Sequence, residues 1–161
     1  MDIEEDGGDE IEALLGFTSN FPVKLDSALR LPIPAKFRSV LNSNYRQYST
    51  KLVVAPDKGK LRMFPIPVWM ETQKRLEASD QFNAEANARN AFIYGHLHQT
   101  AIDAQSRIRL PQSLADMAGL KKDVVVVGKK LSMEIWDAAK WAEFSGKMVE
   151  FSWDMSPGVF P

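Results

Sequence analysis

Two short segments of the chain carry aspartate and arginine at the same spacing. Asp26 and Arg30 lie within residues 25–34, and Asp103 and Arg107 lie within residues 102–111. An apolar residue precedes each aspartate, and an apolar residue, any residue, an apolar residue and proline follow each arginine. A guanidinium is a planar fork of donors that fits phosphate oxygens or a guanine edge with two hydrogen bonds. We expect the aspartates to shape the loops, by accepting loop N–H groups or by holding the arginine at a fixed angle.

The two segments lie 77 residues apart, and the similarity continues along the chain. Residues 61–69 match residues 133–141 at an offset of 72, which places about five extra residues in the first copy, within the polar run 42–48. This self-similarity predicts a duplicated structural unit with a pseudo-twofold axis. Two equivalent loops suit a partner that is itself repetitive, and we expect double-stranded DNA. Further contacts to the DNA backbone are expected from nearby basic residues, namely Lys24, Lys36, Arg38 and Arg109.

A simpler interpretation of each Asp–Arg pair is a surface salt bridge that closes a tight turn. Such a bridge contributes about 0–1 kcal/mol to stability and implies no ligand. For one isolated motif we would prefer this interpretation. Duplication of the pair at matched positions favours contact with DNA.

The remaining chemistry-bearing residues form no recognisable catalytic or metal site. His96 and His98 could share a strand face and bind a metal, but no third ligand cluster accompanies them, so we expect structural roles. The sequence has no nucleophile–base pair, no useful carboxylate pair and no phosphate-binding glycine loop. We predict no enzyme activity, no cofactor, no metal and no small-molecule substrate. The tryptophans are expected in the core or at a subunit interface, namely Trp69, Trp136, Trp141 and Trp153.

The composition is globular, without cysteine, and the charge is unevenly distributed. Of 161 residues, 45% are hydrophobic and 25% charged, and no apolar run is long enough to span a membrane, so we expect a cytoplasmic protein. The net charge is −1, but residues 1–12 hold seven acidic residues and residues 13–161 carry +6. We interpret residues 1–12 as a disordered, solubilising tail. The alternative is an intramolecular competitor for a basic surface.

The expected elements form two α+β halves, residues 13–80 and 81–150, followed by a tail at 151–161. Each half has the order strand, loop, strand, short helix, hairpin and helix. Strands are expected at 17–25, 31–33, 52–55, 61–64, 96–102, 108–110, 124–127 and 131–135.

Proline and apolar spacing indicate the helices. Pro34, Pro67 and Pro111 fit first turns, and Asp137 can cap a further helix. The helix before residue 96 is expected to bury Ala88, Ala91, Phe92 and Gly95. In the last strand we expect Leu131, Met133 and Ile135 to face inward, with Ser132 and Glu134 facing outward.

In these motifs the chain resembles the MraZ family, over about residues 14–150. The resemblance rests on residues 25–34, residues 61–69, the Gly-His segment at 92–96, and residues 103–111. It implies two fused swapped-hairpin units of the AbrB/SpoVT type. It also implies a bacterial transcriptional regulator, associated with the nucleoid, that forms homo-oligomeric rings. Such a protein would bind direct repeats in promoters of the division and cell-wall gene cluster.

The loops depart from the family pattern, Asp-x-Lys-Gly-Arg. Ala28-Leu29 and Gln105-Ser106 replace the Lys-Gly pair. Glycine adopts positive φ at little cost, so we expect Leu29 to resist that conformation and the loop to change shape. One alternative function is therefore a divergent oligomer with weakened DNA binding and a protein-interaction role. Another is the antidote half of a toxin–antidote pair, for which the C-terminal tail is short.

Overall fold

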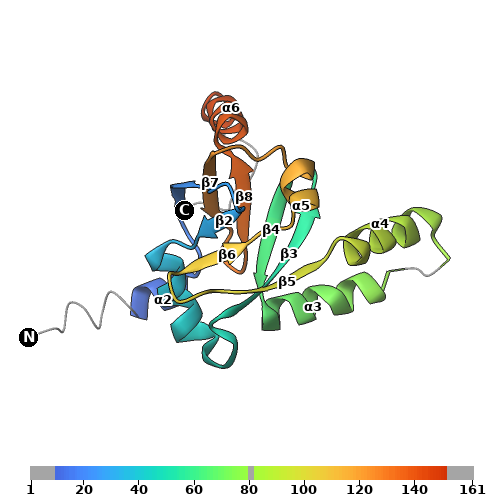
Figure 1. The fold of residues 1–161 in the computed structure, drawn as a ribbon. Helices are drawn as coiled ribbons and strands as arrows, with labels where there is room; N and C mark the ends of the chain where they lie inside the picture. The colour runs from blue at the N-terminus through green and yellow to red at the C-terminus, as the bar shows by residue number, and fades with distance from the viewer. Residues whose placement is uncertain (1–9, 80–81, 152–161) are drawn as a thin grey trace, which may run out of the picture.

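The computed structural model describes residues 10–79 and 82–151, which form an α+β fold. A six-stranded antiparallel sheet has the order β1-β7-β8-β4-β3-β5, and a two-stranded ribbon pairs β2 with β6 (Figure 1). The strands are β1 (Asn20–Lys24), β2 (Arg30–Pro32), β3 (Lys51–Asp57), β4 (Lys60–Pro65), β5 (His98–Ala101), β6 (Arg107–Arg109), β7 (Asp123–Gly128) and β8 (Met133–Asp137). The helices are α2 (Ala35–Asn44), η1 (Arg46–Tyr48), α3 (Ile66–Glu77), α4 (Ala84–Gly95), α5 (Gln112–Met117) and α6 (Ala138–Val149).

Each half of the chain gives one strand to the hairpin of the other half. β1 pairs with β7 of the second half, with Lys24 opposite Asp123. β5 pairs with β3 of the first half, with Ala101 opposite Lys51. Because the strands are exchanged, the two halves share one sheet and one core, which buries more apolar surface than either half could bury alone.

The strand registers have the symmetry that a pseudo-twofold axis requires. Leu31 lies opposite Ile108 in the ribbon, and these two positions correspond at the offset of 77. Arg62 lies opposite Glu134 in the middle of the sheet, and these positions correspond at the offset of 72. The duplicated origin of the halves and the boundary between them stay predictions, which these registers support.

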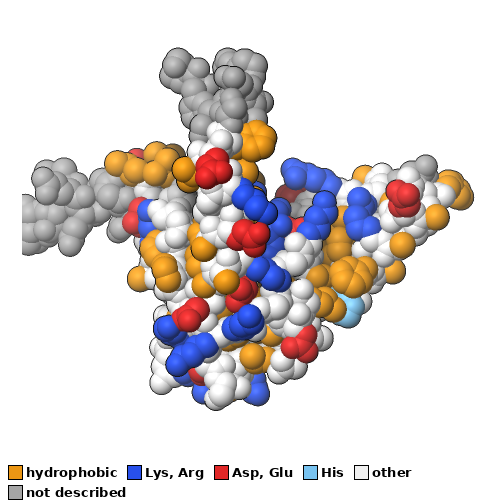
Figure 2. Space-filling model, turned by 90° about the horizontal axis from the view of Figure 1, so that it is seen from above, with side chains coloured by type: hydrophobic (Ala, Val, Ile, Leu, Met, Phe, Trp, Pro, Cys, Tyr) orange, Lys and Arg blue, Asp and Glu red, His pale blue; other side chains and the backbone are white. Residues whose placement is uncertain are grey.

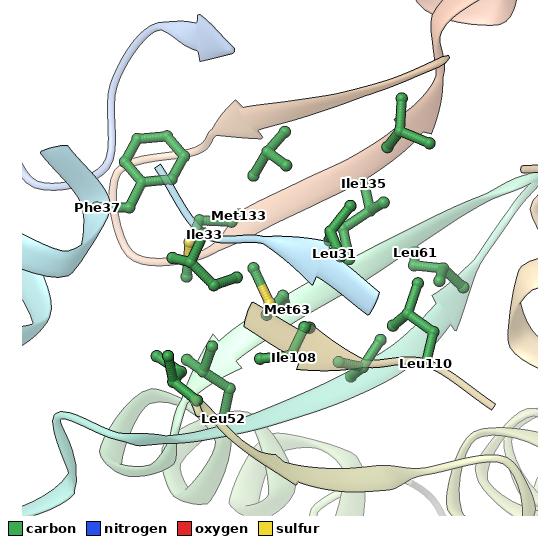
Figure 3. Packing of buried hydrophobic residues seen from close by; sticks show 14 of the residues in the cluster. Leu31, Ile33, Phe37, Leu52, Leu61, Met63, Ile108, Leu110, Met133 and Ile135 are labelled. Carbon is green, nitrogen blue, oxygen red and sulfur yellow. The ribbon is translucent and has the colours of Figure 1, made fainter. Parts of the chain in front are cut away.

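The main core lies between one face of the sheet and a layer formed by the ribbon, α2 and α5 (Figure 3). Leu31 and Ile108 from the ribbon, and Met63 and Met133 from the sheet, are at most 1% exposed. Burying one such side chain contributes about 1.5–3 kcal/mol. This packing fixes the ribbon on the sheet, and it thereby fixes the loops that precede β2 and β6.

The opposite face of the sheet is covered in part by α3 and α6. Trp69 of α3, 4% exposed, packs against Phe64 in a second apolar cluster. Trp136 of β8 contacts the rings of Trp141 and Phe144 on α6. Helices α3 and α4 project from the sheet as an arm, on which hydrophobic side chains gather (Figure 2). Within residues 10–79 and 82–151, no helix combines the length and the apolar character needed to cross a membrane.

The burial pattern just before β8 and at its start differs from our prediction. Leu131 is 56% exposed, whereas Ser132 and Glu134 are 6% and 4% exposed. The strand begins only at Met133, and it is central in the sheet, so both of its faces are covered. Glu134 is tolerated there because its carboxylate lies 3.2 Å from Arg62 Nη2.

The predictions for α4, β5 and the strand starts also need correction. Phe92 is 51% exposed, because α4 contributes Ile93 instead to the apolar cluster that contains Phe64 of β4 and Trp69 of α3. His96 is the C-cap residue that follows α4, and His98 begins β5, so the two histidines do not share a strand face. β1 starts three residues later than predicted, at Asn20.

Three of the residues assigned to the acidic tail have a definite structure. Residues 10–15 are helical, and Asn44 Nδ2 donates a hydrogen bond to the carbonyl of Ala13 at 2.8 Å. The disorder predicted for residues 1–12 is therefore wrong at residues 10–12. Residues 1–9 and Trp153 lie outside the described residues. The predicted cap of α6 is confirmed, since Asp137 Oδ2 accepts from the N–H of Lys140 at 3.4 Å.

Candidate nucleic-acid interface

The first loop, residues 26–30, joins β1 to β2 and closes on the carboxylate of Asp26. Asp26 Oδ1 accepts hydrogen bonds from the backbone N–H groups of Ala28 and Arg30, each at 2.9 Å. The carbonyl of Asp26 accepts from the N–H of Leu29 at 3.0 Å. Asp26 Oδ2 lies 3.7 Å from Arg30 Nη1. One side chain therefore organises the loop backbone and restrains the arginine.

The second loop, residues 103–107, repeats this geometry between β5 and β6. Asp103 Oδ1 accepts from the N–H groups of Gln105 and Arg107, at 2.8 and 3.0 Å. The carbonyl of Asp103 accepts from the N–H of Ser106 at 3.0 Å. Asp103 Oδ2 lies 3.4 Å from Arg107 Nε, and the guanidinium also donates to Gln105 Oε1.

These hydrogen bonds lower the pKa of both carboxyl groups. The largest cause is the N–H of Arg30 for Asp26, and the N–H of Arg107 for Asp103. Desolvation acts in the opposite direction, while the nearby guanidinium charges lower each pKa further. Both aspartates are therefore ionised at neutral pH.

Our prediction that Leu29 would resist a positive φ angle is wrong, whereas a change of loop shape relative to the family stays a prediction. Leu29 and Ser106 occupy the positions where the family pattern has glycine, and both have left-handed φ angles, 61° and 62°. The carbonyl of Leu29 accepts from the N–H of Leu110 at 2.9 Å, and that of Ser106 accepts from the N–H of Ile33 at 2.8 Å. A side chain in this conformation costs about 1–2 kcal/mol. Several loop hydrogen bonds of about 1 kcal/mol each offset that cost.

The fold brings the two loops together. Asp26 Oδ2 lies between Arg30 Nη1, at 3.7 Å, and Arg107 Nη1, at 4.0 Å. Arg30 also lies directly opposite Arg109 in the ribbon. Like charges opposite each other are unfavourable unless an anion lies between or above them. The side chains of Arg30 and Arg107 are 44% and 29% exposed, so both remain accessible.

The other residues predicted to contact DNA differ in whether their charged groups already have partners within the protein. Lys24 is ion-paired with Asp123, and this hydrogen bond lowers the pKa of the Asp123 carboxyl. Arg38 Nη1 donates to Ser106 Oγ at 2.9 Å. Arg109 is exposed and Lys36 half-buried. Within the described residues, no carboxylate lies within 4 Å of the charged nitrogens of Arg38, Lys36 or Arg109.

Two lysines beside the first loop were missed from the sequence. Lys121 and Lys122 line an open hollow of about 500 Å³ together with Asp26. The carbonyl of Lys122 accepts from the N–H of Leu25 at 2.9 Å. These lysines are almost a hundred residues from the loop in sequence, and only the pairing of β1 with β7 brings them there. The sequence shows two adjacent lysines, but it does not show that they lie beside the first loop.

The described part of the chain contains no group of three or more histidine, cysteine, aspartate or glutamate side chains that could hold a metal ion. His98 Nε2 instead lies 3.2 Å from the carbonyl oxygen of Arg109. What the loops present is therefore a cationic surface with rigid backbone support. Such a surface is suited to binding an extended anion.

Comparison with known proteins identifies related chains. Residues 93–156 match a family model described as "MraZ protein, putative antitoxin-like". The chain is 33% identical over 136 residues to the transcriptional regulator MraZ of Thiobacillus denitrificans, covering 84% of this chain and 90% of that protein. Identity to the protein of that name from Nitrosospira multiformis is 35% over 126 residues, covering 78% and 84%. For the Leuconostoc citreum protein it is 32% over 143 residues, covering 89% and 96%. These relatives are named as transcriptional regulators and not as enzymes.

Proposed function

The chain belongs to the MraZ family, and from that premise we propose that it is a sequence-specific DNA-binding transcriptional regulator whose two Asp–Arg loops contact the duplex. Arg30 and Arg107 bind phosphate oxygens or guanine edges. Asp26 and Asp103 hold the loops in shape. Arg109 and Lys36 supply further contacts to the DNA backbone, as do Lys121 and Lys122.

The observation that carries this proposal is the pairing of the two loops on one ribbon. Arg30 stands opposite Arg109, while Arg107 lies within 4.0 Å of the aspartate of the other loop. Three arginines are thus held close together by backbone hydrogen bonds and a buried core. The cost of gathering like charges is recovered when a polyanion binds across them.

The loop geometry argues against the alternative of a divergent oligomer with weakened DNA binding and a protein-interaction role. That alternative started from the replacement of Lys-Gly, which we expected to change the loop. Leu29 and Ser106 both adopt the left-handed conformation that glycine takes readily, so the replacement of glycine does not prevent this backbone geometry. The missing lysines remove one charge from each loop, and Lys121 and Lys122 offset that loss at the first loop.

The finer part of the proposal concerns assembly and target. We expect a homo-oligomeric ring in the bacterial cytoplasm, associated with the nucleoid, that binds direct repeats in the promoter of the division and cell-wall gene cluster. One subunit with two loops would bind weakly. A ring that repeats the loops at a fixed spacing gains affinity because later contacts become intramolecular.

The test is a fluorescence-anisotropy titration of promoter DNA with direct repeats, at several salt concentrations. In the double variant Arg30→Ala, Arg107→Ala we expect affinity to fall. The slope of log affinity against log salt should become shallower by about 1.8 per subunit engaged, about 0.9 for each lost phosphate contact.

A matched control removes the same charge elsewhere. Lys74 and Lys147 are 71% and 75% exposed and lie on α3 and α6, which cover the face of the sheet opposite the ribbon. Their joint replacement by alanine should leave the salt slope unchanged. Equal effects of the two double variants, or affinity that does not depend on salt, would refute the proposed interface and favour a protein-interaction role.

A further inference from the structure

Arg38 connects the two halves of the chain at the second loop. It lies on α2 of the first half, and its Nη1 donates to the hydroxyl of Ser106, at 2.9 Å, in the second half. Ser106 directly precedes Arg107 and has the left-handed φ of 62°. The Nε of Arg38 is buried without a hydrogen-bond partner. The side chain is therefore directed into the protein beneath the loop.

This connection has no counterpart at the first loop. At the offset of 77, Ser106 corresponds to Leu29, and Arg38 corresponds to Ala115. Leu29 is partly buried and packs against the main core, and Ala115 is 2% exposed. Each of these pairs spans both halves of the chain, and the pair is polar at the second loop and apolar at the first. One loop is held by a hydrogen bond from a cation and the other by packing.

We infer that Arg38 is a positioning residue for the second loop and not a DNA contact. This differs from the role that the sequence suggested for it, and it rests on the proposed function. The hydrogen bond fixes the hydroxyl of Ser106, and with it the carbonyl that accepts from the N–H of Ile33. Arg107 leaves the loop at the next residue, so its direction depends on this anchor. Arg30 does not depend on it.

Double-mutant cycles on DNA affinity test this dependence. Arg38→Met keeps much of the side-chain volume and removes the donor. We expect it to weaken binding about tenfold, the size of one hydrogen bond from a charged group. In the Arg30→Ala background the same factor should remain. In the Arg107→Ala background it should nearly vanish, because the arginine that Arg38 positions is already absent.

The salt dependence separates positioning from contact. A phosphate contact at Arg38 would make the salt slope shallower by about 0.9 when the arginine is replaced. We expect the slope of Arg38→Met to match that of the unaltered protein. A change of about 0.9, or a full effect in both backgrounds, would overturn the inference.

Hydrogen exchange of two matched amides tests the anchor without DNA. The N–H of Ile33 donates to Ser106, and the N–H of Leu110 donates to Leu29. Arg38→Met should accelerate exchange at Ile33 severalfold and leave Leu110 unchanged. Ser106→Asn, which tolerates the left-handed conformation and keeps an acceptor, should retain protection. Equal rates before and after replacement, or equal acceleration at both amides, would overturn the anchor. If the unaltered protein binds no DNA, the proposed function fails, and the exchange data alone decide whether Arg38 holds the loop.

Discussion

The left-handed residues in the two loops allow a prediction whose sign is unusual. At most positions alanine is more stable than glycine by about 0.5–1 kcal/mol, because glycine loses more backbone freedom on folding. Leu29 has φ 61°, where a Cβ costs about 1–2 kcal/mol. The difference between these terms favours glycine over alanine at residue 29 by about 0.5–1 kcal/mol. Ser106, with φ 62°, should behave in the same way.

Comparing two truncations isolates this effect. Leu29→Ala and Leu29→Gly both remove the packing of the leucine side chain, so both are expected to be less stable than the unaltered protein. Their difference reports mainly the backbone conformation. Urea unfolding should give the glycine variant the higher free energy of unfolding. For a chain of this size, the melting temperatures should differ by about 1–4 °C.

The neighbouring residue provides the control. Ala28 belongs to the same loop, and it is not among the residues with positive φ. Ala28→Gly should therefore destabilise by about 0.5–1 kcal/mol, the opposite sign to the change from alanine to glycine at residue 29. If alanine equals or exceeds glycine in stability at both 29 and 106, the left-handed loop geometry and the reasoning built on it are wrong.

Two further predictions concern the carboxylates. The pKa values of Asp26 and Asp103 are lowered in the folded protein, so their contribution to stability is present above the ordinary aspartate pKa of about 3.9 and is lost as pH falls through the lowered values. The unaltered protein should therefore lose unfolding free energy, measured with urea, between pH 5 and about 2. The double variant Asp26→Asn, Asp103→Asn should lose less over the same pH range. The buried carboxylate of Glu134 accepts a hydrogen bond from Arg62, which also pairs with Asp57 at 3.0 Å, so Glu134→Leu should destabilise by about 1.5–3 kcal/mol in the same assay. Adding Arg62→Met should restore part of that loss, and a double variant less stable than Glu134→Leu alone would contradict this account.

Local patterns were sufficient to predict much of the fold. Alternation and turn residues indicated the hairpin of β3 and β4, and the apolar run Val124–Val127 indicated a strand covered on both faces, as observed. Our prediction of the buried face of α4 was wrong, because amphipathic spacing does not indicate which neighbouring element a helix packs against. Phe92 is 51% exposed, and its ring contacts His96 instead of the apolar cluster that Ile93 joins. The burial of Glu134 was missed because its partner Arg62 lies 72 residues away in sequence.

The candidate site was predictable in its residue types but not in its conformation or its surroundings. The repeated Asp–Arg spacing identified both loops. Residue propensity alone suggested that Leu29 would avoid positive φ. The structure holds it there with backbone hydrogen bonds from Leu110 and to Asp26, which no single-residue preference includes. Lys121 and Lys122 reach the first loop only through strand exchange, a long-range feature that local patterns do not contain.

The two loops share a backbone and differ in the cations around them. Lys121 and Lys122 lie beside the first loop, and the corresponding residues beside the second loop are Ser49 and Thr50. The backbone contacts match: the carbonyl of Lys122 accepts from the N–H of Leu25 at 2.9 Å, and the carbonyl of Thr50 accepts from the N–H of Ile102 at 2.8 Å. The second loop has Arg38 beneath it, whereas the corresponding residue at the first loop is the apolar Ala115. Symmetric backbone contacts fix the spacing of the two arginines, whereas the surrounding side chains set the strength with which each is held. A pseudo-symmetric regulator of this kind would bind two equivalent DNA positions with unequal strength. Arg30→Ala and Arg107→Ala should therefore weaken binding by different factors, and only the second should depend on the residue at position 38.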